Sequence, residues 1–218
     1  MEEAQHLLCS HESARQIMGS NFIDVAEVRK IFPCLNEDVQ DLEIIPYSRK
    51  SLYLLSEPES NFILFPGIQR CRNRSLTIAE IKRIFCRFPR LFGESLAFFA
   101  SKHFFIDNQN CLPRWYLMPK KTLDMETAMD FLNGNGIPNK KWGREPAIVY
   151  IYARMLFYLL REESIFQNKT FATSDALVRG TKDAQICLNF NDKRILISKW
   201  IDQDKDTPNV VPSLKQHI

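Results

Sequence analysis

Cysteine, histidine and aspartate residues near the middle of the chain are the first candidates for chemistry. His103 and Cys111 flank a predicted turn, and Asp107 lies between them. A cysteine paired with a histidine is an established nucleophile arrangement. The same residue types also occur as a buried thiol and a hydrogen-bonded strand histidine without any chemistry. One function hypothesis is therefore a small enzyme, or a secreted bacterial effector, that uses His103 with Cys111 or Asp107.

The motifs that the sequence offers for metals and cofactors are incomplete. His6, Cys9 and His11 fall within six residues, but structural zinc needs four ligands and no fourth candidate is near. The acidic run 202–206 alternates carboxylates as calcium loops do, yet it lacks the glycine and the closing glutamate of that motif. The sequence has no phosphate-binding loop, dinucleotide fingerprint, HExxH or GxSxG motif. It therefore predicts no metal and no cofactor, and it favours a protein that is not an enzyme.

Charge is distributed unevenly along the chain, although the net charge is only +3. Residues 1–65 carry 5 Lys or Arg against 11 Asp or Glu, whereas residues 66–121 carry 11 against 3, a balance of +8. A basic segment of this size attracts an acidic partner such as nucleic acid, an acidic protein or a membrane surface. Alternatively, the acidic first third covers the basic middle third within one fold and leaves little of it free.

The densest basic cluster surrounds a helix that is predicted to begin after Thr77. Thr77 and Glu80 form a capping box, so a helix runs from here to about Arg87. Arginines interleaved with phenylalanines are typical of surfaces that bind a nucleic-acid backbone and stack on bases, although phenylalanine is more often buried. The predicted binding residues are Arg70, Arg72, Arg74, Lys82, Arg83, Arg87 and Arg90. The leading hypothesis is a noncatalytic binding or adaptor module for nucleic acid or an acidic protein.

Local signals also predict the helices that position these residues. A helix over residues 11–18 ends at Gly19, and a second one begins after Asp24, with Glu27 as its capping-box partner. The central helix is predicted over Pro146 to about Arg161, because apolar residues recur there at helical spacing and also occupy the flanks. That run is too short to span a membrane. We expect it to be a buried core helix, covered on more than one side.

The remaining segments favour strands and an α+β fold. The predicted strands are 42–45, 51–55, 61–65, a hairpin of 103–106 with 114–118, and 169–174, 184–190 and 194–200 in the final third. The segment 133–144 is loop-like, and the tail from Asp202 is charged and expected to lie on the surface or to fray. We predict a single α+β domain over residues 1–218, with helices packed on a mostly antiparallel sheet and a C-terminal β-meander. Its parts are an acidic 1–65, a basic 66–144, and 145–218 with the central helix and the meander.

Cysteine spacing and the amino terminus bear on location. The six cysteines are scattered without CxxC spacing, which argues for reduced, mostly buried thiols. The first residues are acidic and lack a basic region followed by an apolar run, so no secretory signal is predicted. The predicted location is cytoplasmic, without membrane insertion. A bacterial effector exported by a specialised route would have the same features.

The order of motifs resembles that of a family of bacterial proteins without an assigned function. These proteins begin with an "ARQIMG-x-NF" block, which matches Ala14 to Gly19 with Asn21 and Phe22. They continue with a buried helix after a proline and a β-rich end, similar to 146–160 and 186–200 here. The family's Asp-Ser-Asp-Gly turn has no clear match in 175–183. The resemblance implies a bacterial origin and one folding unit, and no activity, cofactor or catalytic residue.

Overall fold

The structure is a computed structural model that describes residues 8–32, 42–56, 61–71, 74–84, 109–123, 126–127, 142–166, 168–171, 185–191, 194–200 and 213–214. Its helices are α1 (His11–Met18), the 3-10 helix η1 (Gly19–Asn21), α2 (Val25–Ile31), α3 (Arg49–Ser56), α4 (Ile78–Ile84) and α8 (Ala147–Arg161). Its strands are β1 (Leu8–Cys9), β2 (Ile45–Ser48), β3 (Phe62–Pro66), β4 (Arg70–Cys71), β5 (Arg74–Ser75), β6 (Trp115–Pro119), β7 (Trp142–Gly143), β8 (Asn168–Phe171), β9 (Gln185–Asn191), β10 (Arg194–Trp200) and β11 (Ser213–Leu214).

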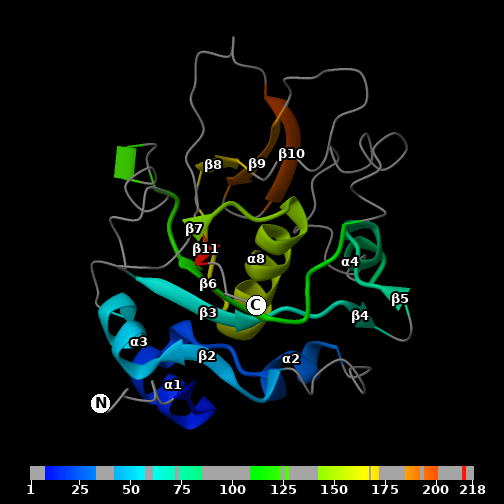
Figure 1. Cartoon of the computed structure of the whole chain (residues 1–218). Coiled ribbons are helices and arrows are strands. Elements are labelled where there is room, and N and C mark those ends of the chain that lie inside the picture. The colour runs from blue at the N-terminus through cyan, green and yellow to red at the C-terminus, as the bar shows by residue number, and fades with distance from the viewer. Residues whose placement is uncertain are drawn as a thin grey trace.

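Helix α8 lies at the centre of the molecule, and the other elements surround it (Figure 1). Every residue from Ala147 to Phe157 is buried, so the helix is covered on all sides along its first three turns. Pro146 is its N-cap and Glu162, in the left-handed conformation, is its C-cap. The prediction of a buried central helix is confirmed. Among the described residues, no helix is long and apolar enough to cross a membrane.

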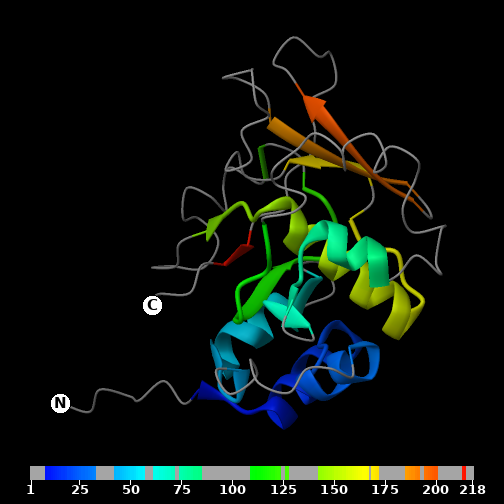
Figure 2. The same cartoon turned by 90° about the vertical axis from the view of Figure 1, so that its right-hand side faces the viewer.

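The amino-terminal elements form a layer below α8, made of α1, α2, α3 and β2 (Figures 1 and 2). Ser10 caps α1, because its hydroxyl accepts a hydrogen bond from the N–H of Ser13 at 3.2 Å. The predicted capping box of α2 is present, and the N–H of Asp24 donates to Oε2 of Glu27 at 3.0 Å. Both amino-terminal helices therefore occur where the sequence predicts them.

The described strands make several small sheets. Strands β3 and β6 pair antiparallel with Phe62 opposite Pro119 and Pro66 opposite Trp115, and both strands are completely buried. Strands β8, β9 and β10 form a three-stranded antiparallel sheet in the order β10-β9-β8 on the far side of α8. The other pairs are β1-β2, β4-β5 and β7-β11. The α+β class is confirmed, whereas the single sheet that the sequence favoured is not found among these strands.

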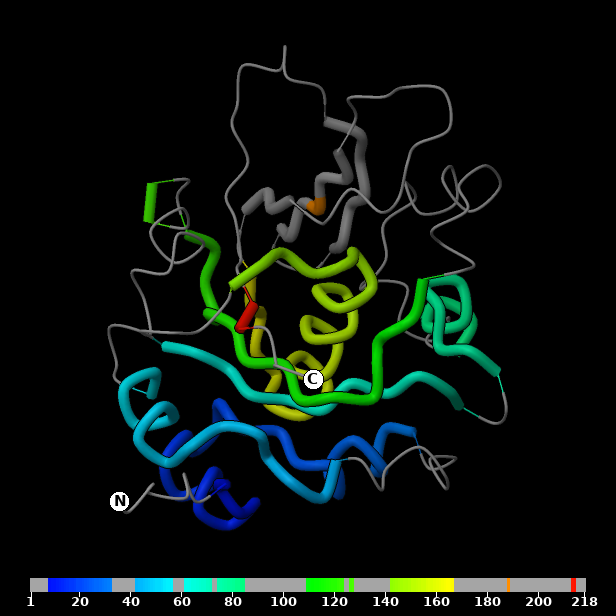
Figure 3. The backbone as a smooth tube through the Cα atoms, in the orientation of Figure 1, coloured from blue at the N-terminus to red at the C-terminus, as the bar shows by residue number. Residues whose placement is uncertain are grey.

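Two segments differ from their predicted structure. Residues 51–55, predicted as a strand, belong to helix α3, whose inner face buries Leu52 and Leu55 three residues apart. The described part of the predicted surface tail is the buried strand β11, which pairs with β7 inside the loop-like segment 133–144. Figure 3 shows this short strand beside β6. The hydroxyl of Tyr47 links β11 to β6, because it donates to the carbonyls of Trp115 in β6 and Leu214 in β11 at 3.3 and 3.5 Å.

The cysteines are not all reduced. Cys9 and Cys111 are free and buried, as predicted, but Cys71 in β4 is disulfide-bonded. The prediction of reduced thiols is therefore wrong for Cys71.

Candidate functional site

The predicted basic cluster is presented by the β4-β5 pair and helix α4, which we call the basic element (residues 70–84). Its outer face carries the exposed side chains of Arg70, Arg74 and Arg83 and the half-buried Lys82. Arg72, Arg87 and Arg90 lie outside the described residues. The sequence of the basic element contains five Lys or Arg and one Glu, a balance of +4. The exposed arginines among the described residues therefore face solvent, and the segment as a whole keeps a net positive charge.

Apolar residues hold the basic element in place. Leu76, Ile78 and Ile81 are completely buried, and α4 packs against α8. The N–H of Leu76 donates to the carbonyl of Gln69 at 2.8 Å, and the N–H of Glu80 donates to Oγ1 of Thr77 at 3.2 Å, so the predicted N-cap of α4 is confirmed. Because the inner face is anchored in the core, the cationic side chains project from a fixed backbone.

One acidic residue partly neutralises the charge of the basic element. Arg83 binds Glu80 through two hydrogen bonds of 2.6 and 2.8 Å. The guanidinium of Arg83 lowers the pKa of Glu80 below its ordinary value, and the charge of Arg74 adds to this effect. Partial burial acts in the opposite direction but is outweighed. Glu80 is therefore ionised at neutral pH and balances one cation, which leaves Arg70, Arg74 and Lys82 as the described residues that carry the net positive charge.

The predicted nucleophile is in an environment unsuited to nucleophilic chemistry. Cys111 is completely buried, and burial followed by the negative charge of Glu145 raises the pKa of its thiol far above the ordinary range. Reactive cysteines need the opposite, an accessible site that lowers the pKa and favours the thiolate. The other two predicted residues, His103 and Asp107, lie outside the described residues.

An ion pair that sequence reasoning missed lies beside Cys111. Arg114 donates to both carboxylate oxygens of Glu145, at 3.1 and 2.9 Å, and its guanidinium lies over the ring of Tyr116 at 4.8 Å. The side chain of Glu145 is 2 % exposed and that of Arg114 is 18 % exposed. Burial alone would lower the pKa of Arg114, because it disfavours the charged form. The effects of Glu145 and Tyr116 are larger together and raise the pKa of Arg114 above its ordinary value. This pair joins the start of α8 to the start of β6.

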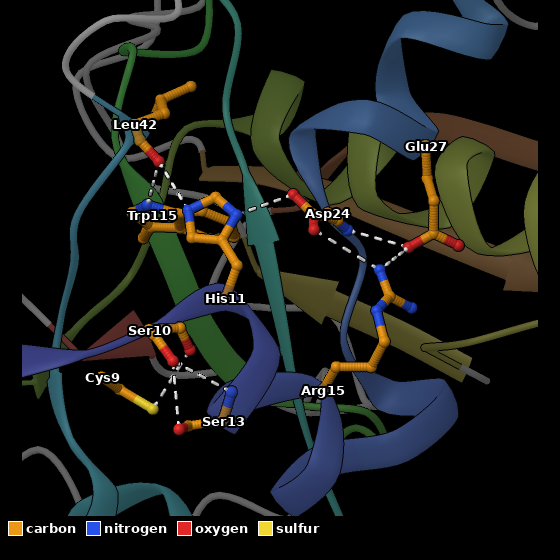
Figure 4. Close-up of polar contacts among 9 residues, drawn as sticks. All are labelled: Cys9, Ser10, His11, Ser13, Arg15, Asp24, Glu27, Leu42 and Trp115. Atoms are coloured by element: carbon orange, nitrogen blue, oxygen red, sulfur yellow. Dashed lines mark hydrogen bonds and ion pairs between the residues drawn. The ribbon is translucent and has the colours of Figure 1, made fainter.

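A second polar cluster joins α1, α2 and the core (Figure 4). Nδ1 of His11 lies 2.8 Å from Oδ1 of Asp24, which is the arrangement of a general base and the carboxylate that orients it. However, Nε2 of His11 lies 3.1 Å from the carbonyl oxygen of Leu42 and is not directed to solvent. A general base needs a nitrogen within reach of its substrate. The cluster therefore has a positioning role, and the capping box at Asp24 was its only sequence signal.

Glu27 connects this cluster to helix α8. Its carboxylate accepts hydrogen bonds from Arg15 at 2.8 Å and from the N–H of Asp24 at 3.0 Å, and it pairs with Arg161 of α8 at 2.7 Å. Arg161 also donates to the carbonyl of Phe22 at 3.0 Å. Burial alone would raise the pKa of Glu27, but the Asp24 N–H, Arg15 and Arg161 together lower it below its ordinary value.

We expect Glu27→Gln to lower the free energy of unfolding by about 2 kcal/mol at neutral pH, because the variant loses the charge in several hydrogen bonds. A lowered pKa in the folded state contributes stability that is complete above the unfolded pKa of about 4.3 and is lost as the pH falls. The difference between Glu27→Gln and wild type should therefore shrink on acidification. Urea denaturation at a series of pH values measures this difference. Glu43→Gln, at an exposed site, is the control, and a Glu27→Gln difference that does not change with pH would contradict the account.

Metal binding finds no support in the described part of the chain, where no group of three or more His, Cys, Asp or Glu residues could hold an ion. Of the predicted trio, His6 lies outside the described residues and both ring nitrogens of His11 are occupied by protein oxygens. Comparison with known protein families, curated proteins and solved structures finds no match for this chain.

Proposed function

We propose that this chain is a noncatalytic binding or adaptor module and that the basic element binds an acidic partner, either nucleic acid or an acidic protein. The observation that carries the proposal is the division of the basic element into two faces. Leu76, Ile78 and Ile81 are buried, while Arg70 and Arg74 are exposed. Because the backbone that carries these cations is already anchored, binding of an anion requires ordering of the side chains but not of the backbone.

The described helices of the acidic first third and the basic element lie on different sides of α8. In Figure 1, α1, α2 and α3 lie below α8, whereas β4, β5 and α4 lie at its right-hand side. The carboxylate of Glu27 is engaged by arginines of α1 and α8. Among the described residues, this arrangement supports a basic surface that remains free for a partner.

The form of the enzyme alternative that uses Cys111 receives less support, because Cys111 is buried and its environment raises the pKa of the thiol. The form that pairs His103 with Asp107 lies outside the described residues. A bacterial origin and a single folding unit, which the family resemblance implies, are part of the proposal. So is the predicted cytoplasmic location.

Charge reversal tests the proposal directly. The double variant Arg70→Glu with Arg74→Glu should weaken binding at least about tenfold. The slope of log affinity against log salt concentration should become shallower by about one for each phosphate contact that the variant loses. The probes are a fluorescent random-sequence single-stranded oligonucleotide and a polyglutamate peptide, each titrated by fluorescence anisotropy at several salt concentrations. A preference for the oligonucleotide would assign the partner as nucleic acid, and a preference for the peptide as acidic protein.

The matched control is Arg49→Glu with Lys50→Glu on α3. Both residues are exposed, the change in net charge is the same, and α3 lies on the other side of the view in Figure 1 from α4. Equal losses of affinity in the two double variants would mean that only the overall charge matters. Unchanged affinity in the Arg70 and Arg74 variant would refute the assignment of the basic element.

A further inference from the structure

The hairpin of β4 and β5 has one buried side chain among its described residues, and that side chain is Cys71. Cys71 is 5 % exposed, whereas Arg70, Arg74 and Ser75 are exposed. Each strand has only two residues, with Arg70 opposite Ser75 and Cys71 opposite Arg74. A two-stranded hairpin without further packing is at best marginally stable in water. The side chains of the two strands therefore contribute little to holding this hairpin in one position.

Two kinds of contact fix the hairpin to the rest of the protein. At its base, Ile68 and Leu76 are buried, and the N–H of Leu76 donates to the carbonyl of Gln69 at 2.8 Å. Nearer the connection between the two strands, Cys71 is disulfide-bonded. Because Cys71 is the only cysteine in the basic element, its bond joins this element to a different part of the chain. The hairpin is thus held at its base by packing and further out by a covalent bond.

The hairpin and α4 belong to one cationic surface. Strand β5 lies beside α4 in Figure 1. Arg83 has the largest effect in lowering the pKa of Glu80 on α4, and the charge of Arg74 on β5 adds to it, so Arg74 is near enough to α4 to act on it electrostatically. Cys71 is directly opposite Arg74 in the hairpin. A bond at Cys71 therefore restrains the strand pair that presents Arg74 to this surface.

We propose that the disulfide of Cys71 is a positioning group for anion binding, which holds Arg70 and Arg74 beside α4 and so makes the affinity depend on the oxidation of Cys71. In the oxidised protein the hairpin is ordered before the partner arrives. In the reduced protein it must be ordered on binding, and this cost lowers the affinity. Opening the bond at neutral pH leaves the net charge almost unchanged, because a disulfide is uncharged and thiols are mostly protonated there. This inference rests on the proposed function of the basic element.

Comparison of the oxidised and reduced protein tests the inference. Dithiothreitol opens the bond by two exchanges: one of its thiolates displaces a cysteine thiol and forms a mixed disulfide, and the other displaces the second cysteine thiol and leaves cyclic oxidised dithiothreitol. The affinity for whichever anionic probe the oxidised wild type binds, the oligonucleotide or polyglutamate, should fall at least about fivefold on reduction. Cys71→Ser should bind as weakly as the reduced wild type and should not respond to dithiothreitol. The control Cys9→Ser removes a free cysteine and should keep the wild-type response.

Hydrogen–deuterium exchange of the wild type gives a second readout that needs neither a variant nor a partner. On reduction, the amides of β4 and β5 should exchange faster, whereas exchange in α8 should stay as slow as in the oxidised protein. Unchanged exchange in β4 and β5, or equal affinity of the two forms for the probe, would overturn the inference. Faster exchange in α8 would also overturn it, because the bond would then stabilise the whole fold. An oxidised wild type that binds neither probe would instead refute the proposed function itself, while the exchange still shows whether the bond fixes the hairpin.

Discussion

Arg114→Met is expected to lower the free energy of unfolding by about 3–5 kcal/mol, because it leaves the buried Glu145 carboxylate without its guanidinium. Glu145 is 2 % exposed, so water cannot replace the two missing hydrogen bonds of 3.1 and 2.9 Å. Methionine keeps an unbranched apolar side chain in place of the apolar stem of arginine and removes the guanidinium. The expected loss therefore reflects charge more than packing. Urea denaturation at neutral pH measures it.

The double variant Arg114→Met with Glu145→Gln isolates the cause. It removes both charges, so it should be more stable than Arg114→Met alone, although it has one more substitution. The control is Arg49→Met on the exposed face of α3, which should change stability by less than about 0.5 kcal/mol. If Arg114→Met costs as little as Arg49→Met, the pair between α8 and β6 does not stabilise the fold.

Leu156→Ala is expected to cost about 2–5 kcal/mol, since it opens a cavity in the completely buried part of α8. The melting temperature of a chain of this size should fall by roughly 2–4 °C for each kcal/mol. Differential scanning calorimetry with circular dichroism measures the loss. Leu54→Ala in α3 makes the same substitution at a side chain that is 50 % exposed, and it should cost less than about 0.5 kcal/mol.

Comparable losses in the two leucine variants would contradict the arrangement in which α8 is covered on all sides. A large loss in Leu54→Ala alone would indicate instead that α3 is packed against another surface in solution. The pair of leucines therefore tests the packing of the fold with the chemistry of the substitution held constant.

The helices were predictable where their signals are local. The caps at Gly19, Asp24 and Thr77 lie within three or four residues of the groups that they satisfy, and the structure confirms all three. Helix α3 was misread because Leu52, Leu54 and other apolar residues form a run that also suits a strand. The signal that identifies it is Ser48, whose hydroxyl accepts from the N–H of Ser51 at 3.1 Å as an N-cap does.

The contacts that assemble the fold were not predictable because they join distant residues. Arg114 and Glu145 are 31 positions apart, and His11 and Leu42 are also 31 apart. No spacing rule connects such pairs in a single sequence. The pairing of β3 with β6 is equally non-local, and β6 was expected to form a hairpin with residues 103–106, which lie outside the described residues.

The basic element was predictable as a charged segment but not as a surface. Composition identified Arg70, Arg74, Lys82 and Arg83. The exposure of Lys82 and Arg83 depends on which side of α4 packs against α8, and that of Arg70 and Arg74 on the pairing of β4 with β5. The reduction of charge by Glu80 depends on a side-chain geometry that composition does not show. Four of the seven predicted cations, Arg70, Arg74, Lys82 and Arg83, are described residues that variants can test.

The most direct test of the proposed function is capture of the native partner by the tagged protein from its own cell lysate, with and without nuclease. Wild type and Arg49→Glu/Lys50→Glu should retain the same nucleic acid or acidic protein, and Arg70→Glu/Arg74→Glu should lose it. Loss on nuclease treatment would identify nucleic acid, and survival would identify a protein partner. Retention of the partner by Arg70→Glu/Arg74→Glu at the wild-type level would contradict the central claim that the basic element is the binding surface.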